Sequence, residues 1–289
     1  MKTLLNLTPV CLLFVLFTSC SKTFFQVYSV VPSKGIVAND NSLIFEDDNC
    51  KIAYNLWDEG GNIGFRFTNK TNEDIHLDME KCFFVLNGVS HNYFRNRTYT
   101  TPITADKIST KTSFWEALLT PNVYTAKDYT ELNHNYRTQF NENKSDLTTN
   151  GFNVSTIQEE KLVCVPAHTT KIFKEYTVNN VYYRDCELER FPSKKQIVNR
   201  KYTKQDSPFI FGNRIAYYTG DSKELIRLEN TFHVAEIANY PLKRITEYRY
   251  DKFCGQEKVY YNNLRTYFTI YAPDKFYITY KNLYDRWKY

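Results

Sequence analysis

Residues 51–69, KIAYNLWDEGGNIGFRFTN, alternate apolar and polar side chains on both sides of a glycine pair. Every second residue is apolar from Ile52 to Leu56 and again from Ile63 to Phe67. A period of two with one apolar face is typical of a half-buried β-strand. Gly60 and Gly61 tolerate the positive φ angles that a tight reversal requires. The stretch therefore predicts an antiparallel hairpin with its turn at DEGGN.

The same alternation continues along the chain. Residues 75–79, IHLDM, form another short period-two segment, and 82–88, CFFVLNG, end in Asn87-Gly88, a strong hairpin signal. Further strands are predicted at 24–31, 162–165, 172–178, 213–220, 230–241, 266–273 and 275–280. The chain holds 24 Tyr and 21 Phe but only 9 Gly, and aromatic residues favour the pleated, half-buried surface of strands. We predict a mainly β fold, an antiparallel β-sandwich. The alternative explanation of the high aromatic content is a sugar-binding surface of exposed Tyr and Trp.

One region departs from this pattern. Between about 95 and 160, Thr, Asn, Lys and Asp crowd the sequence and the strand alternation fades. Ser113 to Glu116 and Asp128 to Glu131 have the spacing of helix capping boxes ahead of apolar residues. We expect a partly helical insertion in a sandwich domain that runs from 45 to 289.

The amino terminus has the features of an export signal. Lys2 precedes a short, mostly apolar run, and small residues follow at Thr18 and Ser19. This arrangement is typical of a secretory signal peptide, and the run is too short and too interrupted to span a bilayer. We expect residues 1–19 to be removed and residues 20–44 to form a tether and a first strand.

The end of that signal, Leu16-Phe17-Thr18-Ser19-Cys20, resembles the lipobox of bacterial lipoproteins, with Phe17 where that family usually has Leu. The resemblance implies that Cys20 becomes the acylated first residue and attaches the chain to a membrane. The alternative is an ordinary signal peptide with a coincidental cysteine. No acidic cluster follows Cys20, and the resemblance then implies the periplasmic face of the outer membrane rather than the cell surface.

Three stretches extend the resemblance. NLWDEGGNIGFRFTN at 55–69, VPAHTTK at 165–171 and FHVAEIANYP at 232–241 are similar to uncharacterised outer-membrane lipoproteins of gut bacteria. The resemblance implies an immunoglobulin-like sandwich and brings no assigned activity.

Charge and cysteine content argue against two kinds of ligand, nucleic acid and zinc. With 37 basic and 32 acidic residues, the net charge is +5, without the dominant basic stripe of a nucleic-acid binder. Five cysteines would remain beyond Cys20, namely Cys50, Cys82, Cys164, Cys186 and Cys254. Their wide spacing does not suit a zinc site. We expect one disulfide at most, no metal and no cofactor, and the pairing stays open.

Four residues are candidates for ligand binding. Trp57 lies beside the DEGG turn and Trp115 in the insertion; both could be exposed aromatics, or they could anchor their segments to the core. Lys194 and Lys195 begin a basic stretch that could meet lipid or lipopolysaccharide phosphates, or be a solvated loop. His168 in the VPAHTTK turn could line a site or be a turn residue.

No signature of a hydrolase or a phosphate-binding loop occurs in the chain. The expected function is therefore that of a membrane-anchored envelope lipoprotein that binds another envelope component, protein or glycan, without catalysis. A further possibility is a purely structural lipoprotein without a discrete ligand site. The alternative is a glycan hydrolase whose carboxylates converge only in the fold.

Overall fold

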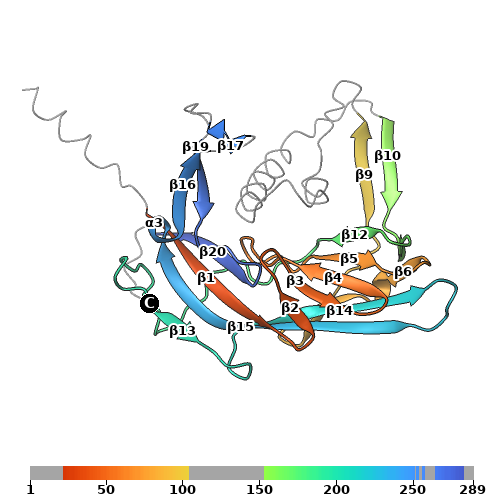
Figure 1. Ribbon diagram of the computed structural model, residues 1–289, viewed down its shortest axis with the longest axis horizontal. Coiled ribbons are helices and arrows are strands. Elements are labelled where there is room, and N and C mark those ends of the chain that lie inside the picture. The colour runs from red at the N-terminus through yellow and green to blue at the C-terminus, as the bar shows by residue number, and fades with distance from the viewer. Residues whose placement is uncertain (1–21, 104–152, 251, 254–255, 258–263, 283–289) are drawn as a thin grey trace, which may run out of the picture.

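The fold is a mainly β arrangement of two antiparallel sheets packed face to face (Figure 1). The computed structural model describes residues 22–103, 153–250, 252–253, 256–257 and 264–282. Cys20 and Trp115, and the helix starts predicted at 113 and 128, lie outside these residues. The predicted mainly β class and the antiparallel sheets are confirmed.

The larger sheet has nine strands within the described residues. Its main path runs β11-β6-β14-β15-β1-β20. Off this path, β7 pairs with β14, β8 pairs with β7, and β13 pairs with β15. The strands are β1 (Thr23–Pro32), β6 (Ile75–Asp78), β7 (Phe83–Leu86), β8 (Val89–Asn92), β11 (Leu162–Val165), β13 (Asn199–Lys201), β14 (Ile210–Thr219), β15 (Ile226–Pro241) and β20 (Lys275–Lys281). The long β15 runs almost the whole length of the sandwich (Figure 1).

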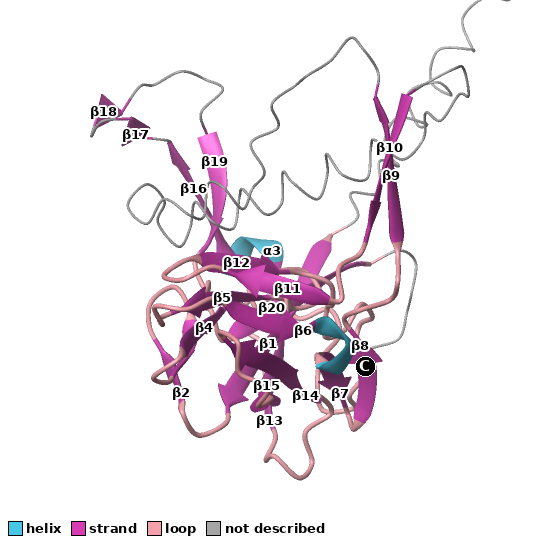
Figure 2. Ribbon diagram, turned by 90° about the vertical axis from the view of Figure 1, so that its right-hand side faces the viewer, coloured by secondary structure: helices cyan, strands magenta, loops and turns pink. Residues whose placement is uncertain are grey.

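The smaller sheet covers part of one face of the larger one (Figure 2). Its order is β12-β5-β4-β3-β2. The strands are β2 (Ile36–Ala38), β3 (Leu43–Glu46), β4 (Cys50–Tyr54), β5 (Phe65–Asn69) and β12 (Thr170–Phe173). The predicted strand at 172–178 is wrong in its second half, because β12 ends at Phe173 and the chain then leaves the edge of the sheet.

Two hairpins rise from the sandwich on the side of the smaller sheet (Figures 1 and 2). Their strands are β9 (Thr98–Ile103) with β10 (Asn153–Gln158), and β16 (Thr246–Tyr250) with β19 (Leu264–Phe268). The shorter β17 (Lys252–Phe253) pairs with β18 (Gln256–Glu257). The described helical turns are η2 (Met79–Lys81) and α3 (Leu242–Ile245). The hairpin β9–β10 flanks residues 104–152, where the helical insertion is predicted.

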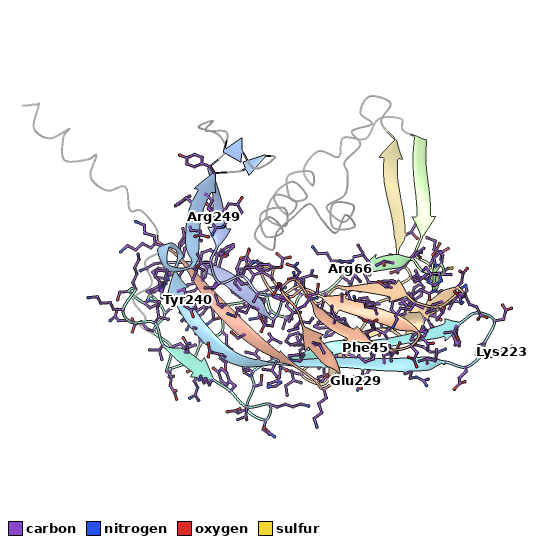
Figure 3. The ribbon with its side chains drawn as sticks, viewed as in Figure 1. Phe45, Arg66, Lys223, Glu229, Tyr240 and Arg249 are labelled. Carbon is purple, nitrogen blue, oxygen red and sulfur yellow. The ribbon has the colours of Figure 1, made fainter. Side chains whose placement is uncertain are left out.

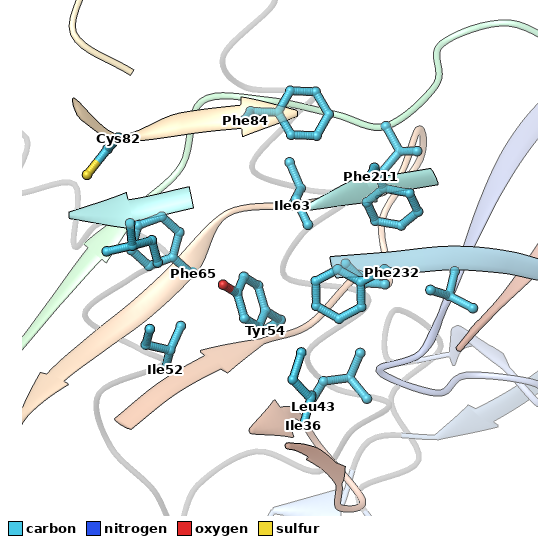
Figure 4. Close-up of a cluster of buried hydrophobic side chains, with 14 of the residues drawn as sticks. Ile36, Leu43, Ile52, Tyr54, Ile63, Phe65, Cys82, Phe84, Phe211 and Phe232 are labelled. Carbon is cyan, nitrogen blue, oxygen red and sulfur yellow. The ribbon is translucent and has the colours of Figure 1, made fainter. Parts of the chain in front are cut away.

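The main core lies between the two sheets (Figure 4). The ring of Tyr54 packs on Phe232, with centroids 5.2 Å apart, and Phe67 packs on Tyr217 at 5.6 Å. Buried Asn230 donates a hydrogen bond from Nδ2 to the Tyr54 hydroxyl at 2.8 Å. Aromatic side chains therefore join the sheets, and a buried amide satisfies the polar end of one of them.

The opening stretch folds differently from the predicted tight hairpin. β4 ends at Tyr54 and β5 starts at Phe65, and these two residues are register partners. The intervening residues 55–64 form a long loop that reaches β20, where Gly60 N–H donates to the Tyr277 carbonyl at 2.8 Å. By contrast, the turn predicted at Asn87-Gly88 is confirmed, with φ values of 47° and 83° as a two-residue reversal requires.

A charge network closes the base of the β9–β10 hairpin. The Arg97 guanidinium contacts Glu159 at 2.5 Å and Glu175 at 2.6 Å. Glu159 also accepts the backbone N–H of Arg95 and Arg97, each at 2.9 Å. Partial burial raises the pKa of Glu159, but these hydrogen bonds outweigh it and lower the pKa from 4.5 to about 2. The hairpin is thus held to the sandwich by a carboxylate that must stay ionised.

The described cysteines are free thiols. Cys50 and Cys82 are buried, Cys164 is half-buried and Cys186 is exposed. Burial raises the pKa of Cys82 to about 11, so this thiol packs as a small neutral side chain. Cys254 lies outside the described residues, so the expectation of one disulfide at most stays a prediction.

Candidate functional site

The candidate site is a hollow of about 410 Å³ between two loops. One loop is the turn between β2 and β3, and the other connects β19 to β20. We call it the Tyr271 hollow. Its lining residues are Ala38, Asn39, Asp40, Phe268, Thr269, Tyr271, Ala272, Pro273 and Asp274. The two loops are more than 200 residues apart in sequence, and the hollow exists only because the sheets bring them together.

Asn55, at the start of the long loop 55–64, ties the two walls to each other. Its side-chain Nδ2 donates to the Asn41 carbonyl at 3.0 Å and to the Tyr271 hydroxyl at 2.6 Å. The next residue, Leu56, donates its backbone N–H to the Pro273 carbonyl at 2.9 Å. A hollow held by hydrogen bonds from a third segment is preformed.

Aromatic rings back the hollow. Phe268 packs against Trp57 at 5.3 Å and against Phe25 at 5.5 Å. Trp57 also contacts the rings of Tyr271 at 5.6 Å and Tyr277 at 5.2 Å, mostly edge to face. Such tilted and edge-on contacts are the preferred aromatic geometry. The rings that reach the hollow therefore stand on a second, buried layer of rings.

The position of Trp57 corrects the exposed-aromatic prediction. Its side chain is 1% exposed and cannot contact a ligand from solvent. Its indole Nε1 is buried without a hydrogen-bond partner among the described residues. Trp57 anchors its loop, which was the other reading of a loop tryptophan, and it supports the site from behind.

The glycine pair at 60–61 allows this loop to fold back. Both residues have positive φ, 85° and 77°. A Cβ on Gly61 would lie 2.9 Å from a ring carbon of Phe276, closer than packed atoms approach. The pair is thus needed for close contact with β20 rather than for a two-residue turn.

The rim of the hollow is polar. Asn39 Oδ1 accepts the backbone N–H of Asn41 at 3.0 Å and of Ser42 at 2.7 Å, which fixes the turn. Asp40 next to it is exposed, and Asp274 on the other wall is half-buried. Burial raises the pKa of Tyr271 to about 12, so its hydroxyl stays neutral. The lining of the hollow combines aromatic residues with carboxylate and amide residues.

The other predicted site residues lie elsewhere. Lys194 and Lys195 are exposed in the irregular segment before β13, outside the lining of the hollow. In the part of the chain that the structure describes, neither forms an ion pair within 4.0 Å. His168 is exposed, has φ 57° and contacts Asn72 Oδ1 through Nε2 at 2.9 Å, which is the geometry of a turn residue.

Sequence reasoning missed the residues that line the hollow. Asn39 and Asp40 were visible only as polar turn residues, Tyr271 to Pro273 as the end of a predicted strand, and Asp274 as the residue between two predicted strands. The Asn-Asp-Asn run and the Tyr-Ala-Pro-Asp run each indicate a loop. No local signal shows that the two loops meet, since that depends on how β1 and β20 pair.

No family model, curated protein or solved structure matches this chain. Over the residues described, no helix has the length and apolar character needed to cross a bilayer. The same residues hold no group of three or more His, Cys, Asp or Glu placed to bind a metal ion.

Proposed function

We propose that the protein is a lipid-anchored envelope protein that binds a glycan in the Tyr271 hollow without catalysis. The observation that carries this proposal is the lining of the hollow, where Phe268 and Tyr271 lie among Asn39, Asp40 and Asp274. Sugar rings present C–H groups that pack on aromatic faces, and hydroxyls that donate to carboxylates and amides. The volume of about 410 Å³ falls within the range of small-ligand sites.

The preformed walls support binding of a compact ligand. Asn55 and Leu56 hold both loops before any ligand arrives, so little conformational entropy is lost on binding. Trp57 keeps Phe268 and Tyr271 from collapsing inward. A peptide partner would instead be expected to use an open strand edge.

The binding test uses the two carboxylates that line the hollow. Asp40→Asn with Asp274→Asn keeps the shape of the rim and removes its charge. On an array of labelled bacterial envelope saccharides, the wild-type protein should retain at least one glycan. Titration with that glycan should show about ten-fold weaker binding for the double variant, as expected for the loss of hydrogen bonds to charged groups.

Asp48→Asn is the matched control, because Asp48 is exposed in the neighbouring turn between β3 and β4. This variant should bind as the wild type does. Retention of no glycan at all, or equal affinity in the double variant and the wild type, would remove the proposal.

The anchor is proposed from the sequence. The lipobox-like end at Cys20 supports removal of residues 1–19, acylation of Cys20 and attachment to the outer membrane on its periplasmic face. Growth with an alkyne fatty acid should label the wild-type protein, and Cys20→Ala should lose the label. An unmodified Cys20, or residues 1–19 still attached in mass spectra, would contradict the anchor. The immunoglobulin-like variety of the sandwich is proposed from the separate resemblance of residues 55–69, 165–171 and 232–241 to uncharacterised outer-membrane lipoproteins.

A glycan hydrolase is the second candidate, because Asp40 and Asp274 both line the hollow. Hydrolysis needs two carboxyl groups on opposite sides of the scissile bond. For a hydrolase, either single Asn variant would abolish release of reducing ends from the bound glycan while retaining affinity for it. Binding without release of reducing ends would favour the non-enzymatic proposal.

A further inference from the structure

Four chain segments meet at the end of the sandwich where β1 begins. Thr23 is the register partner of Lys281 at the end of β20. Phe24 pairs with Tyr280 on one side and with Pro241 of β15 on the other. Its ring packs on Phe191 at 5.3 Å, which brings in the segment before β13. These segments, 22–24, 190–196, 240–246 and 279–281, form what we call the anchor-side face.

The four segments of the anchor-side face are basic in sequence, and the carboxylate that reaches them from the loop 55–64 is that of Glu59, whose Oε1 accepts the Thr279 backbone N–H at 3.4 Å. The four segments contain seven basic residues and no Asp or Glu. The basic residues are Lys22, Arg190, Lys194, Lys195, Lys243, Arg244 and Lys281. All of them except the half-buried Arg190 are exposed. In a chain with 32 acidic residues and a net charge of only +5, this separation makes a local positive field.

The loop that carries Lys194 and Lys195 is held in place just before them. The Arg190 guanidinium lies over the rings of Phe191 and Tyr182, 5.1 and 5.5 Å from their centroids. The Tyr280 hydroxyl donates to the Arg190 carbonyl at 2.5 Å. The hydrogen bond to Tyr280 of β20 fixes the chain four residues before Lys194, so the loop with the two lysines starts from a fixed point at the anchor-side face.

Nearby carboxylates are engaged with other cations. Arg200 contacts Glu187 at 2.6 Å and Asp185 at 3.7 Å. Arg249 contacts Glu247 at 2.6 Å. Asp185, Glu187 and Glu247, which flank the face in sequence, therefore pair with arginines outside it rather than with Lys194, Lys195 or Lys243.

We propose that the anchor-side face binds the phosphate headgroups of anionic phospholipids in the membrane that carries the anchor. This inference rests on the proposed acylation of Cys20. Cys20 precedes Thr23 by three residues, and three residues span at most about 11 Å. A bilayer surface at Cys20 is thus within reach of the basic side chains. Each such residue is attracted to an anionic surface over roughly a Debye length.

The test uses the acylated full-length product inserted in vesicles. An amine-reactive reagent would label exposed lysines, with each site read by mass spectrometry. In vesicles of about one part phosphatidylglycerol to three parts phosphatidylcholine, labelling of Lys194, Lys195 and Lys243 should fall about three-fold relative to pure phosphatidylcholine. Lys223, at the opposite end of the molecule from Tyr240 (Figure 3), should label equally in both.

A charge reversal and its control complete the design. Lys194→Glu with Lys195→Glu should restore the labelling of Lys243 in anionic vesicles. The control pair Lys223→Glu with Arg227→Glu, exposed at the far end, should leave Lys243 protected. Free inorganic phosphate in place of the anionic lipid should protect none of them, and lipid A in neutral vesicles should protect less than phosphatidylglycerol.

Equal labelling of Lys194 and Lys223 in anionic vesicles would overturn the proposal, as would stronger protection by lipid A or by free phosphate. The same mass spectra report the acyl chains on Cys20. An acylated protein whose lysines stay reactive refutes the face alone, whereas an unacylated residue 20 refutes the anchor.

Discussion

Two hydrophobic clusters draw residues from the same strands, β1 and β20, but have different roles. The main core between the sheets takes Tyr28 and Phe276, whereas a small cluster on the other face takes Phe25, Val27 and Tyr277. Successive side chains of a strand point to opposite faces, so one pair of strands serves both clusters. The main core holds the sheets together. The small cluster, with Trp57 at its centre, supports a surface hollow. Burial alone thus does not distinguish a residue of the fold from a residue of the site.

The largest effect is expected from the main core. Phe232 is 1% exposed and packs on Tyr54 and Phe211. Phe232→Ala should lower the free energy of unfolding by about 3–5 kcal/mol, since it removes a ring and leaves a cavity. Urea unfolding would measure this. Under conditions where the variant remains folded, glycan affinity should be unchanged, and a loss of affinity would show that the clusters are not separable.

A smaller loss of stability but a larger loss of binding is expected from the other cluster. Trp57→Ala should lower the free energy of unfolding by about 3 kcal/mol, near the low end for such changes, because a site beside a surface loop can partly collapse. The same collapse should abolish glycan binding. Trp57→Phe, which keeps a ring against Phe268, should restore part of the affinity. A Trp57→Ala protein with full affinity would contradict the supporting role.

The base of the β9–β10 hairpin belongs to neither cluster and depends on charge. The pKa of Glu159 is about 2 in the folded protein against 4.5 when unfolded. Its stabilisation is therefore complete above pH 4.5 and is lost as the pH falls toward 2. Glu159→Gln should cost about 1–2 kcal/mol at pH 7, less than the full shift implies because solvent screens Arg97.

Unfolding of wild type and Glu159→Gln at several pH values would measure this loss, and hydrogen exchange at residues 98–103 would locate it. The difference between the two proteins should shrink from pH 4.5 downward. Glu73→Gln is a suitable control, since its side chain is outside this network. A difference independent of pH would show that shape rather than charge holds the hairpin.

The smallest effect on stability is expected at the hollow itself. Tyr271→Phe removes the hydroxyl that accepts from Asn55 at 2.6 Å and keeps the ring. The cost should be about 1 kcal/mol, typical of one hydrogen bond, and glycan affinity should fall because the two walls separate. Tyr248→Phe, on the exposed face of β16, should change neither quantity.

The sequence predicted the strands and turns whose conformation depends on neighbouring residues. The alternation at 51–54 and 65–69 predicts β4 and β5, and Asn87-Gly88 predicts its turn, because neighbouring residues decide both. The same alternation led to a wrong prediction at Leu56 and Trp57, where the strand was expected to continue. These residues lie in a buried loop, which also needs apolar side chains. The hollow could not be predicted because Asp40 and Asp274 come to line one site only through strand pairing between distant parts of the chain. The charge of Lys194 made it a candidate from the sequence. The sequence does not show that its loop lies beside the start of β1, because that depends on the contacts of Arg190 and Phe191.

The place of β1 in the larger sheet has a mechanical consequence. β1 lies between β15 and β20 and runs antiparallel to both. A tension applied at its first residue acts along the strand, perpendicular to the hydrogen bonds of both ladders. Those bonds must then shear together rather than open one by one. If the protein is tethered through this end, a force on the tether would pull β1 out of the sheet less readily than the same force would open an edge hairpin such as β9–β10.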